Sequence, residues 1–154
     1  MAKAIAVPDI SSRAFQLACE RVMNASPRQL YRAWTEHFDV WFAAPGTVLM
    51  RGEVNAPFFF ETHFQGARHP HYGRFLRLER DRLVEMTWLT SATGGFETVV
   101  TVDLTPADSA SDSEGAKLRL THAGFPDEPS RKRHADAWPM VLQQMDEKLA
   151  AHKS

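Results

Sequence analysis

The chain has 154 residues, of which 44% are hydrophobic and 24% charged, the composition of an ordinary globular protein of one domain. Its formal net charge of -1 gives no general attraction to nucleic acid or to an anionic membrane surface. No stretch is apolar for long enough to span a membrane or serve as a secretory leader, and the single Cys19 cannot form an internal disulfide. We therefore expect a cytoplasmic protein that binds neither nucleic acid nor membrane, with a flexible arm over residues 1–12 and one domain over residues 13–154.

The first elements expected after the arm are a strand and two short helices. Apolar and polar residues alternate from residue 15 to about Met23, as in a half-buried strand. Ser26 then provides a helix cap and Pro27 suits the first helical position, so a helix should follow directly. A second short helix is expected over residues 38–42.

The middle of the chain predicts a run of consecutive strands. Short turns rich in Gly, Pro, Asn and Asp separate alternating segments, and strands joined in this way pair antiparallel. The fold class should therefore be α+β, with a curved antiparallel sheet that has its helices on one side. The polar run of residues 106–115 should be mobile. The expected strands are residues 47–51, 58–65, 71–80, 82–90, 96–104 and 116–122.

The last predicted element is a long amphipathic helix. Apolar residues recur at steps of three and four between Ala135 and Leu149, with polar residues on the other side. Asp127 should cap the helix and Pro129 fits its first turn. Pro139 should either bend the helix or mark a later start, because an interior proline removes a backbone hydrogen bond.

Strand alternation points one face of the sheet toward this helix. Such an aromatic face fits a solid core as well as a ligand cavity, and periodicity does not separate the two. The residues expected to point inward are Phe58, Phe60, Thr62, Phe64, Val84, Met86, Trp88, Phe96, Thr98, Val100, Val102, Leu104, Leu118, Leu120 and His122.

Several local motifs, in their order along the chain, resemble those of a known family. They are residues 26–35 (SPRQLYRAWT), 39–42 (DVWF), 73–76 (GRFL), 82–88 (RLVEMTW) and 118–126 (LRLTHAGFP), followed by His134, Ala135, Trp138 and Pro139. Over residues 15–150 the chain resembles the homologues of the activator of the heat-shock protein 90 ATPase, within the START-like or Bet v 1-like superfamily. The resemblance implies a helix-grip fold, in which the sheet wraps the C-terminal helix and encloses a hydrophobic cavity. It also raises a stress-response role and chaperone binding, which the residues themselves do not support.

The candidate ligand-binding residues would surround that cavity. His122 could donate a hydrogen bond or act as an acid or base, or it could be a structural histidine. Tyr72 could supply a hydroxyl, and Arg74 either sits at the mouth of the cavity or lies in a bulge. His134 could meet His122 or the rim, or lie exposed. The full set is Trp41, Phe42, Phe60, Tyr72, Arg74, Trp88, His122, Phe125 and Trp138.

We predict a non-enzymatic binding domain for a small apolar or amphipathic molecule, with no cofactor and no metal. His69, His71 and His63 suggest a metal site, but no Cys or acidic partner stands near them in the sequence. The alternatives are a cyclase-like or hydrolase-like enzyme that uses His122, Tyr72 or Arg74, and a stress-related co-chaperone. An exposed strand edge is compatible with a homodimer.

Overall fold

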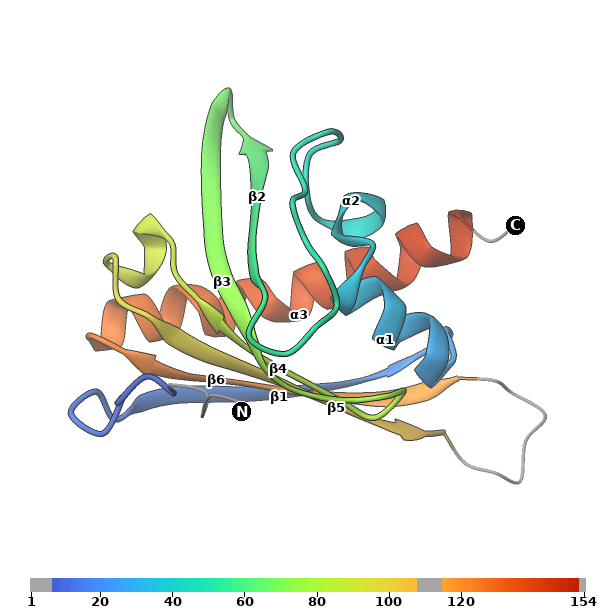
Figure 1. Ribbon diagram of the computed structural model, residues 1–154, viewed down its shortest axis with the longest axis horizontal. Coiled ribbons are helices and arrows are strands. Elements are labelled where there is room, and N and C mark those ends of the chain that lie inside the picture. Colours follow the sequence, from blue (N-terminus) through green and yellow to red (C-terminus); the bar gives the residue numbers. More distant parts are fainter. Residues whose placement is uncertain (1–6, 108–114, 153–154) are drawn as a thin grey trace, which may run out of the picture.

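The computed structural model describes residues 7–107 and 115–152, within which six strands form one antiparallel sheet. Along the sheet the order is β1-β6-β5-β4-β3-β2 (Figure 1). The strands are β1 (Phe15–Met23), β2 (Pro57–Phe64), β3 (Ala67–Glu79), β4 (Leu83–Trp88), β5 (Thr98–Pro106) and β6 (Ala116–Phe125). The helices are α1 (Pro27–Thr35), α2 (Phe38–Trp41), the 3-10 turn η1 (Ser91–Thr93) and α3 (Glu128–Ala151).

The long helix α3 lies along one face of the curved sheet. Figure 1 shows β1, β6, β5 and β4 running along the helix, while the β2–β3 hairpin stands up beside it. The short helices α1 and α2 follow the first strand, and their buried side chains join the same core. The predicted α+β helix-grip fold is confirmed. No helix of the described residues is long and apolar enough to cross a membrane.

The curvature of the sheet is concentrated in β3. Its first half pairs with β2 and its second half with β4, and a bulge interrupts the register with β4 between Phe75 and Arg77. At Gly73 an added Cβ would lie 2.2 Å from the carbonyl oxygen of Thr87 and 2.3 Å from Cζ of Phe58. Only glycine allows this close approach of two chain segments, so Gly73 is where the hairpin can turn away from the rest of the sheet.

The start and the face of α3 agree with the sequence. The Asp127 side chain accepts from the backbone N–H of Ser130, and the helix continues through Pro139 to Ala151. Trp138, Leu142 and Met145 are buried. The helical spacing does not predict the buried carboxylate on the same face. Asp146 is 3% exposed and accepts from the backbone N–H and the side-chain amide of Asn24, both at 3.0 Å.

Three strand predictions differ from the structure by more than two residues. A strand is expected from residue 71, but β3 begins at Ala67, because residues 67–70 pair with β2. Residues 47–51 form no strand, because only Leu49 bridges to Phe59 and its neighbours run as a loop along the edge of β2. The strand expected over residues 116–122 continues to Phe125, since Gln16 pairs with Ala123 and Phe15 with Phe125 across a bulge in β6 at Gly124, whose φ is 94°.

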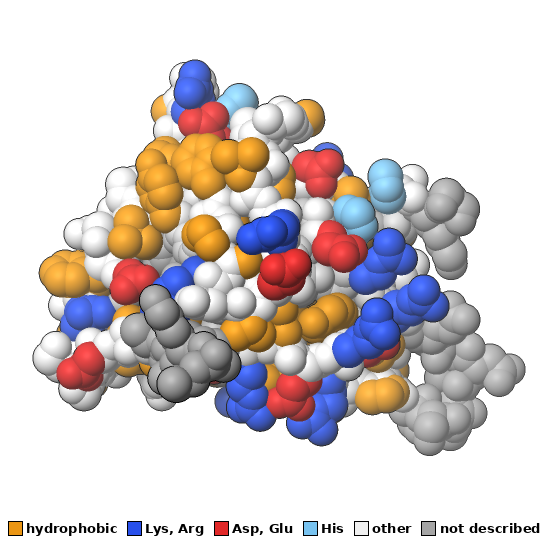
Figure 2. Space-filling model, in the orientation of Figure 1, with side chains coloured by type: hydrophobic (Ala, Val, Ile, Leu, Met, Phe, Trp, Pro, Cys, Tyr) orange, Lys and Arg blue, Asp and Glu red, His pale blue; other side chains and the backbone are white. Residues whose placement is uncertain are grey.

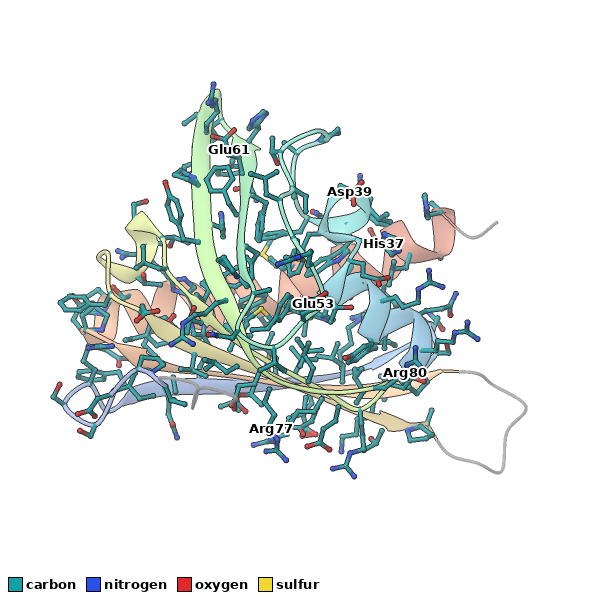
Figure 3. All side chains as sticks on the ribbon, viewed as in Figure 1. His37, Asp39, Glu53, Glu61, Arg77 and Arg80 are labelled. Atoms are coloured by element: carbon teal, nitrogen blue, oxygen red, sulfur yellow. The ribbon has the colours of Figure 1, made fainter. Side chains whose placement is uncertain are left out.

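The predicted inward face is confirmed for most of its members, and its exceptions lie outside the sheet's curved centre. Phe64 ends β2 and Phe96 precedes β5, and these side chains are 64% and 45% exposed. On the opposite face Arg77 is exposed and points away from α3 (Figure 3).

The expected arm and the expected mobile run are only partly described. Residues 1–6 and 108–114 lie outside the described residues. Within the described part, the guanidinium of Arg13 donates to the backbone carbonyls of Gly124 and Glu97, at 2.7 and 2.6 Å. The side chain of Ile10 lies against Gly124. The chain is therefore attached to the sheet from about residue 10 onward.

Candidate functional site

Aromatic rings fill the space directly beneath α3. Trp34, Phe38 and Trp41 are almost fully buried, and Phe38 stacks on Phe60 with ring centroids 4.8 Å apart. Trp34 in turn contacts Trp138 at 6.1 Å. Of the candidate residues, Trp41, Phe60, Phe125 and His122 are fully enclosed in this core.

An apolar groove of about 480 Å³ opens beside the core, between α3 and the β2–β3 hairpin. The hairpin contributes Thr62, His63, Phe64, His69 and His71. Helix α3 contributes His134, Ala137, Trp138, Val141 and Gln144. Phe42 and the segment from Trp88 through η1 complete the lining. Three candidate residues, Phe42, Trp88 and Trp138, are therefore brought together at one site.

His71 lies in the wall of this groove, enclosed by aromatic rings. Its ring stacks on Phe60 at 4.7 Å and meets the rings of Phe42 and Trp88 edge to face at 5.5 and 5.2 Å. Its Nδ1 lies 2.9 Å from the carbonyl oxygen of His69 and must carry the proton, because a carbonyl only accepts. Burial lowers the pKa of His71 to about 4. The ring is therefore neutral at physiological pH.

His122 is closed within the core by a chain of hydrogen bonds. The indole N–H of Trp138 donates to His122 Nδ1 at 3.0 Å. The Nε2–H therefore points to the hydroxyl of Thr98 at 2.7 Å, and that hydroxyl donates to the carbonyl of Trp88 at 2.5 Å. Burial holds the pKa of His122 well below its usual value. Both ring nitrogens are therefore paired within the protein. This pairing fits a structural histidine, which the sequence suggests as the alternative to an acid or base.

His134 lines the groove and also contacts His122. Its Nδ1 donates to the carbonyl of Ser130 one turn earlier in α3, at 2.8 Å. Its ring lies edge to face on His122 at 5.0 Å and beside Phe125 at 4.8 Å. Partial burial lowers its pKa, and the neighbouring Arg133 adds to that effect.

Tyr72 and Arg74 lie outside the groove. Tyr72 is 47% exposed and packs on Phe59 at 5.2 Å, in a region where Figure 2 shows hydrophobic side chains gathered over the hairpin. Arg74 donates to the side chain of Asn55 at 3.3 Å. The bulge in β3 explains why Tyr72 does not face inward. Counting alternate residues back from Leu76 gives the wrong face beyond the bulge, so His71, not Tyr72, faces the core.

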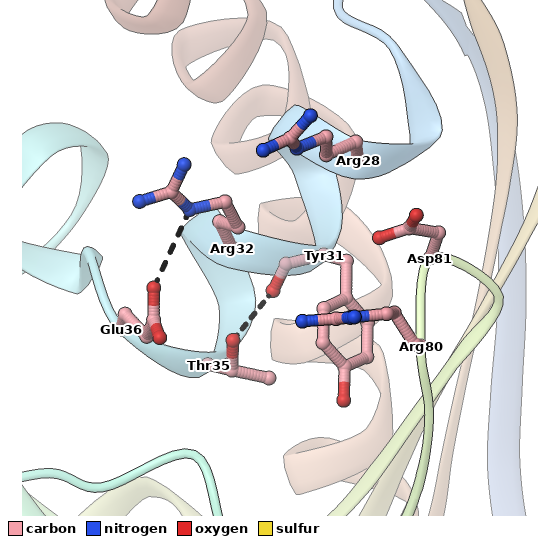
Figure 4. A pocket seen from close by; sticks show the side chains of 7 residues that line it. All are labelled: Arg28, Tyr31, Arg32, Thr35, Glu36, Arg80 and Asp81. Carbon is pink, nitrogen blue, oxygen red and sulfur yellow. Dashed lines mark hydrogen bonds and ion pairs between the residues drawn. The ribbon is translucent and has the colours of Figure 1, made fainter.

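A second hollow, of about 540 Å³, lies between α1 and the β3–β4 turn and is entirely different in chemistry (Figure 4). Three arginines, Arg28, Arg32 and Arg80, line it together with Glu36 and Asp81. Arg32 pairs with Glu36 at 3.5 Å, with both side chains about half exposed. Charges of both signs on an open surface are typical of a solvated face, so we take the apolar groove as the candidate site.

The four histidines that line the groove do not form a metal centre. Across residues 7–107 and 115–152, no three His, Cys, Asp or Glu side chains are arranged to hold a metal ion. His63 lies instead 3.7 Å from the carboxylate of Glu61.

Residues 24–150 match the model of the family described as Activator of Hsp90 ATPase homolog 1-like protein. No curated protein is significantly similar in sequence. A solved Chromobacterium violaceum protein is 23% identical with a TM-score of 0.70, over 86% of this chain and 95% of its own. A Mesorhizobium loti protein is 21% identical with a TM-score of 0.67, over 90% and 98%. A Staphylococcus epidermidis protein is 14% identical with a TM-score of 0.70, over 92% and 93%. At these identities the likeness shows the fold alone.

Proposed function

The chain belongs to the Activator of Hsp90 ATPase homolog 1-like family, and from that premise we propose that it is a non-enzymatic binding domain for a small uncharged apolar molecule. The binding site is the groove between α3 and the β2–β3 hairpin. The observation that carries the proposal is the lining, in which Phe42, Trp88, Trp138 and Val141 meet in one concave space of about 480 Å³. Apolar concave sites of this size are typical of small-molecule binding.

The charge of the lining supports an uncharged ligand. No Lys, Arg, Asp or Glu among the described residues lines the groove. A charged ligand would lose its hydration without gaining an ionic partner, which is costly in an apolar site. An apolar ligand would instead cover the exposed side chains of Phe64 and Ala137 and the partly exposed side chains of Phe42 and Val141, and it would gain from the area removed from water.

A fluorescent probe tests the proposal. N-phenyl-1-naphthylamine is uncharged and brightens in apolar surroundings, and we expect it to bind the wild-type protein saturably. Ala137 is exposed and lines the groove, so Ala137→Phe should fill part of the space and weaken binding roughly tenfold. Met140→Phe is the matched control, because Met140 is on the same helix, 72% exposed, and outside the lining. Equal affinities of the two variants would contradict the proposal.

The other functions suggested by the sequence remain predictions. The enzyme hypothesis requires at least two of His122, Tyr72 and Arg74 to meet at one cavity, and none of the three lines the groove formed by the described residues. The chaperone hypothesis now rests on the family description. Co-purification with the chaperone and an effect on its ATP turnover would test it. The possible homodimer is likewise open to measurement by native mass spectrometry.

A further inference from the structure

Two histidines that line the groove each have one ring nitrogen that can only accept a hydrogen bond, because the other nitrogen donates to the backbone. His71 and His134 each use Nδ1–H to donate to a backbone carbonyl, of His69 and of Ser130. In a neutral imidazole the second nitrogen, Nε2, then carries only a lone pair. Both rings are held neutral by burial, which lowers the pKa of each.

The two Nε2 atoms are accessible. Among the described residues, the buried side-chain nitrogen and oxygen atoms that lack a partner are Arg21 Nε and Trp34 Nε1. Neither Nε2 is in that set, and neither accepts a hydrogen bond within the described part of the chain. Both side chains line the groove, so an occupant of the groove could meet their free acceptors.

The other polar groups of the lining are not held to the same direction. Among the described residues no side-chain hydrogen bond fixes the tautomer of His69, His63 lies beside the Glu61 carboxylate, and the Thr90 hydroxyl accepts from the backbone N–H of Ala92. Hydroxyls of Thr62 and Ser91 can donate as well as accept. The side-chain amide of Gln144 already donates to the carbonyl of Trp41 at 2.9 Å. The guanidinium of Arg133 bonds the Ser130 hydroxyl at 3.3 Å and does not line the groove.

We propose that the groove selects uncharged ring compounds that carry a hydroxyl or N–H donor, with His71 and His134 accepting through Nε2. This inference rests on the proposed function and specifies its ligand class. Aromatic walls favour a flat ring, and a fixed acceptor favours a donor over an ether or a carboxylate at the same position. A ligand that offers only acceptors would face two lone pairs that it cannot satisfy.

A set of matched naphthalenes tests the proposal by calorimetric titration at neutral pH. We expect 2-naphthol to bind the wild-type protein roughly five- to tenfold more tightly than 2-methoxynaphthalene, with 2-naphthoate weaker than either. In the double variant His71→Phe/His134→Phe the two affinities should converge, while 2-methoxynaphthalene binds within about twofold of wild type. His37→Phe is the control, because His37 is exposed and outside the groove lining.

Nitrogen NMR of histidine-labelled wild-type protein supplies a second measurement, which does not depend on the folding of a variant. Addition of 2-naphthol should shift the Nε2 signals of His71 and His134 and leave His122, whose two nitrogens are already paired, nearly unchanged. Equal binding of 2-naphthol and 2-methoxynaphthalene, or unmoved Nε2 signals on saturation, would overturn the ligand class and leave the proposed function standing. Failure of every naphthalene and of the fluorescent probe to bind would overturn both.

Discussion

His122 and His71 both lie beside Trp88, with ring centroids 6.5 and 5.2 Å from it, yet they belong to regions of opposite character. Both are buried and both are surrounded by aromatic rings. Around His122 every polar atom of the ring is paired within the protein. Around His71 only Nδ1 is paired, and Nε2 has no hydrogen-bond partner within the described part of the chain. Both histidines are buried, so they differ in whether the second ring nitrogen has a partner. We call the surroundings of His122 the closed region and those of His71 the open region.

The hairpin that carries His71 is held against the closed region at Gly73, and this contact gives the largest predicted effect. Gly73→Ala would place a methyl group 2.2 Å from the carbonyl of Thr87 and 2.3 Å from the Phe58 ring. The backbone cannot yield without moving the hairpin, so we expect a loss of about 3 kcal/mol or more in the free energy of unfolding. Urea denaturation measures it.

Gly66→Ala is the matched control for this change. Gly66 lies in the turn of the same hairpin with a φ of 76° and has nothing within 4 Å of an added Cβ. Its cost should be the left-handed backbone penalty alone, about 1 kcal/mol. If both variants lose the same stability, the close approach at Gly73 does not hold the hairpin.

Exchanging each histidine for phenylalanine tests the comparison directly. His122→Phe leaves the buried indole N–H of Trp138 without an acceptor, and we expect it to cost about 2–3 kcal/mol. His71→Phe keeps the aromatic stack on Phe60 and should cost less than about 1 kcal/mol. Thermal and urea unfolding of the two variants give the numbers. Similar losses of unfolding free energy in the two variants would contradict the difference between the fully paired His122 and the half-paired His71.

The sequence was sufficient to predict the framework of the fold. The cap at Asp127, the spacing of Trp138, Leu142 and Met145, and the alternation in β4 to β6 are local signals that tertiary packing leaves unchanged. No strand forms at the predicted residues 47–51, because an extended apolar segment pairs as a strand only where the edge of a neighbouring strand lies in register with it.

The site was harder to predict because it depends on one bulge. Phe42, Trp88 and Trp138 were identified from parity and motif order, and they do line the groove. Alternation counted back from Leu76 places Tyr72 on the inward side, because the bulge between Phe75 and Arg77, which inverts the facing of earlier residues, leaves no mark in the period of the sequence. Phe75 and Leu76 are adjacent in the chain and both are buried, which a regular alternation of inward and outward residues does not allow.

Acid should act on both regions through their neutral histidines. Unfolded imidazoles have a pKa near 6.5, whereas burial lowers the pKa of His71 to about 4 and that of His122 well below its usual value. Below the unfolded value the unfolded state takes up protons that the folded state does not, so stability falls as pH falls. His71 alone should remove about 2 kcal/mol between about pH 7 and pH 5. Urea denaturation at the two pH values should show a smaller drop in His71→Phe, and an unchanged drop would contradict this.

The smallest effect on stability is expected at the outer end of the groove. Phe64 ends β2, is 64% exposed and lines the groove, so in the free protein it contributes little packing. Phe64→Ser should change the free energy of unfolding by less than about 0.5 kcal/mol. A bound ring would cover the Phe64 side chain, however, so the variant should bind the naphthylamine probe roughly three- to tenfold more weakly. Val22→Ser on β1, at a side chain 69% exposed and outside the lining, is the control. Wild-type affinity in Phe64→Ser would restrict the binding surface to the rest of the lining, where Phe42, Ala137 and Val141 carry the apolar surface that a ligand can cover.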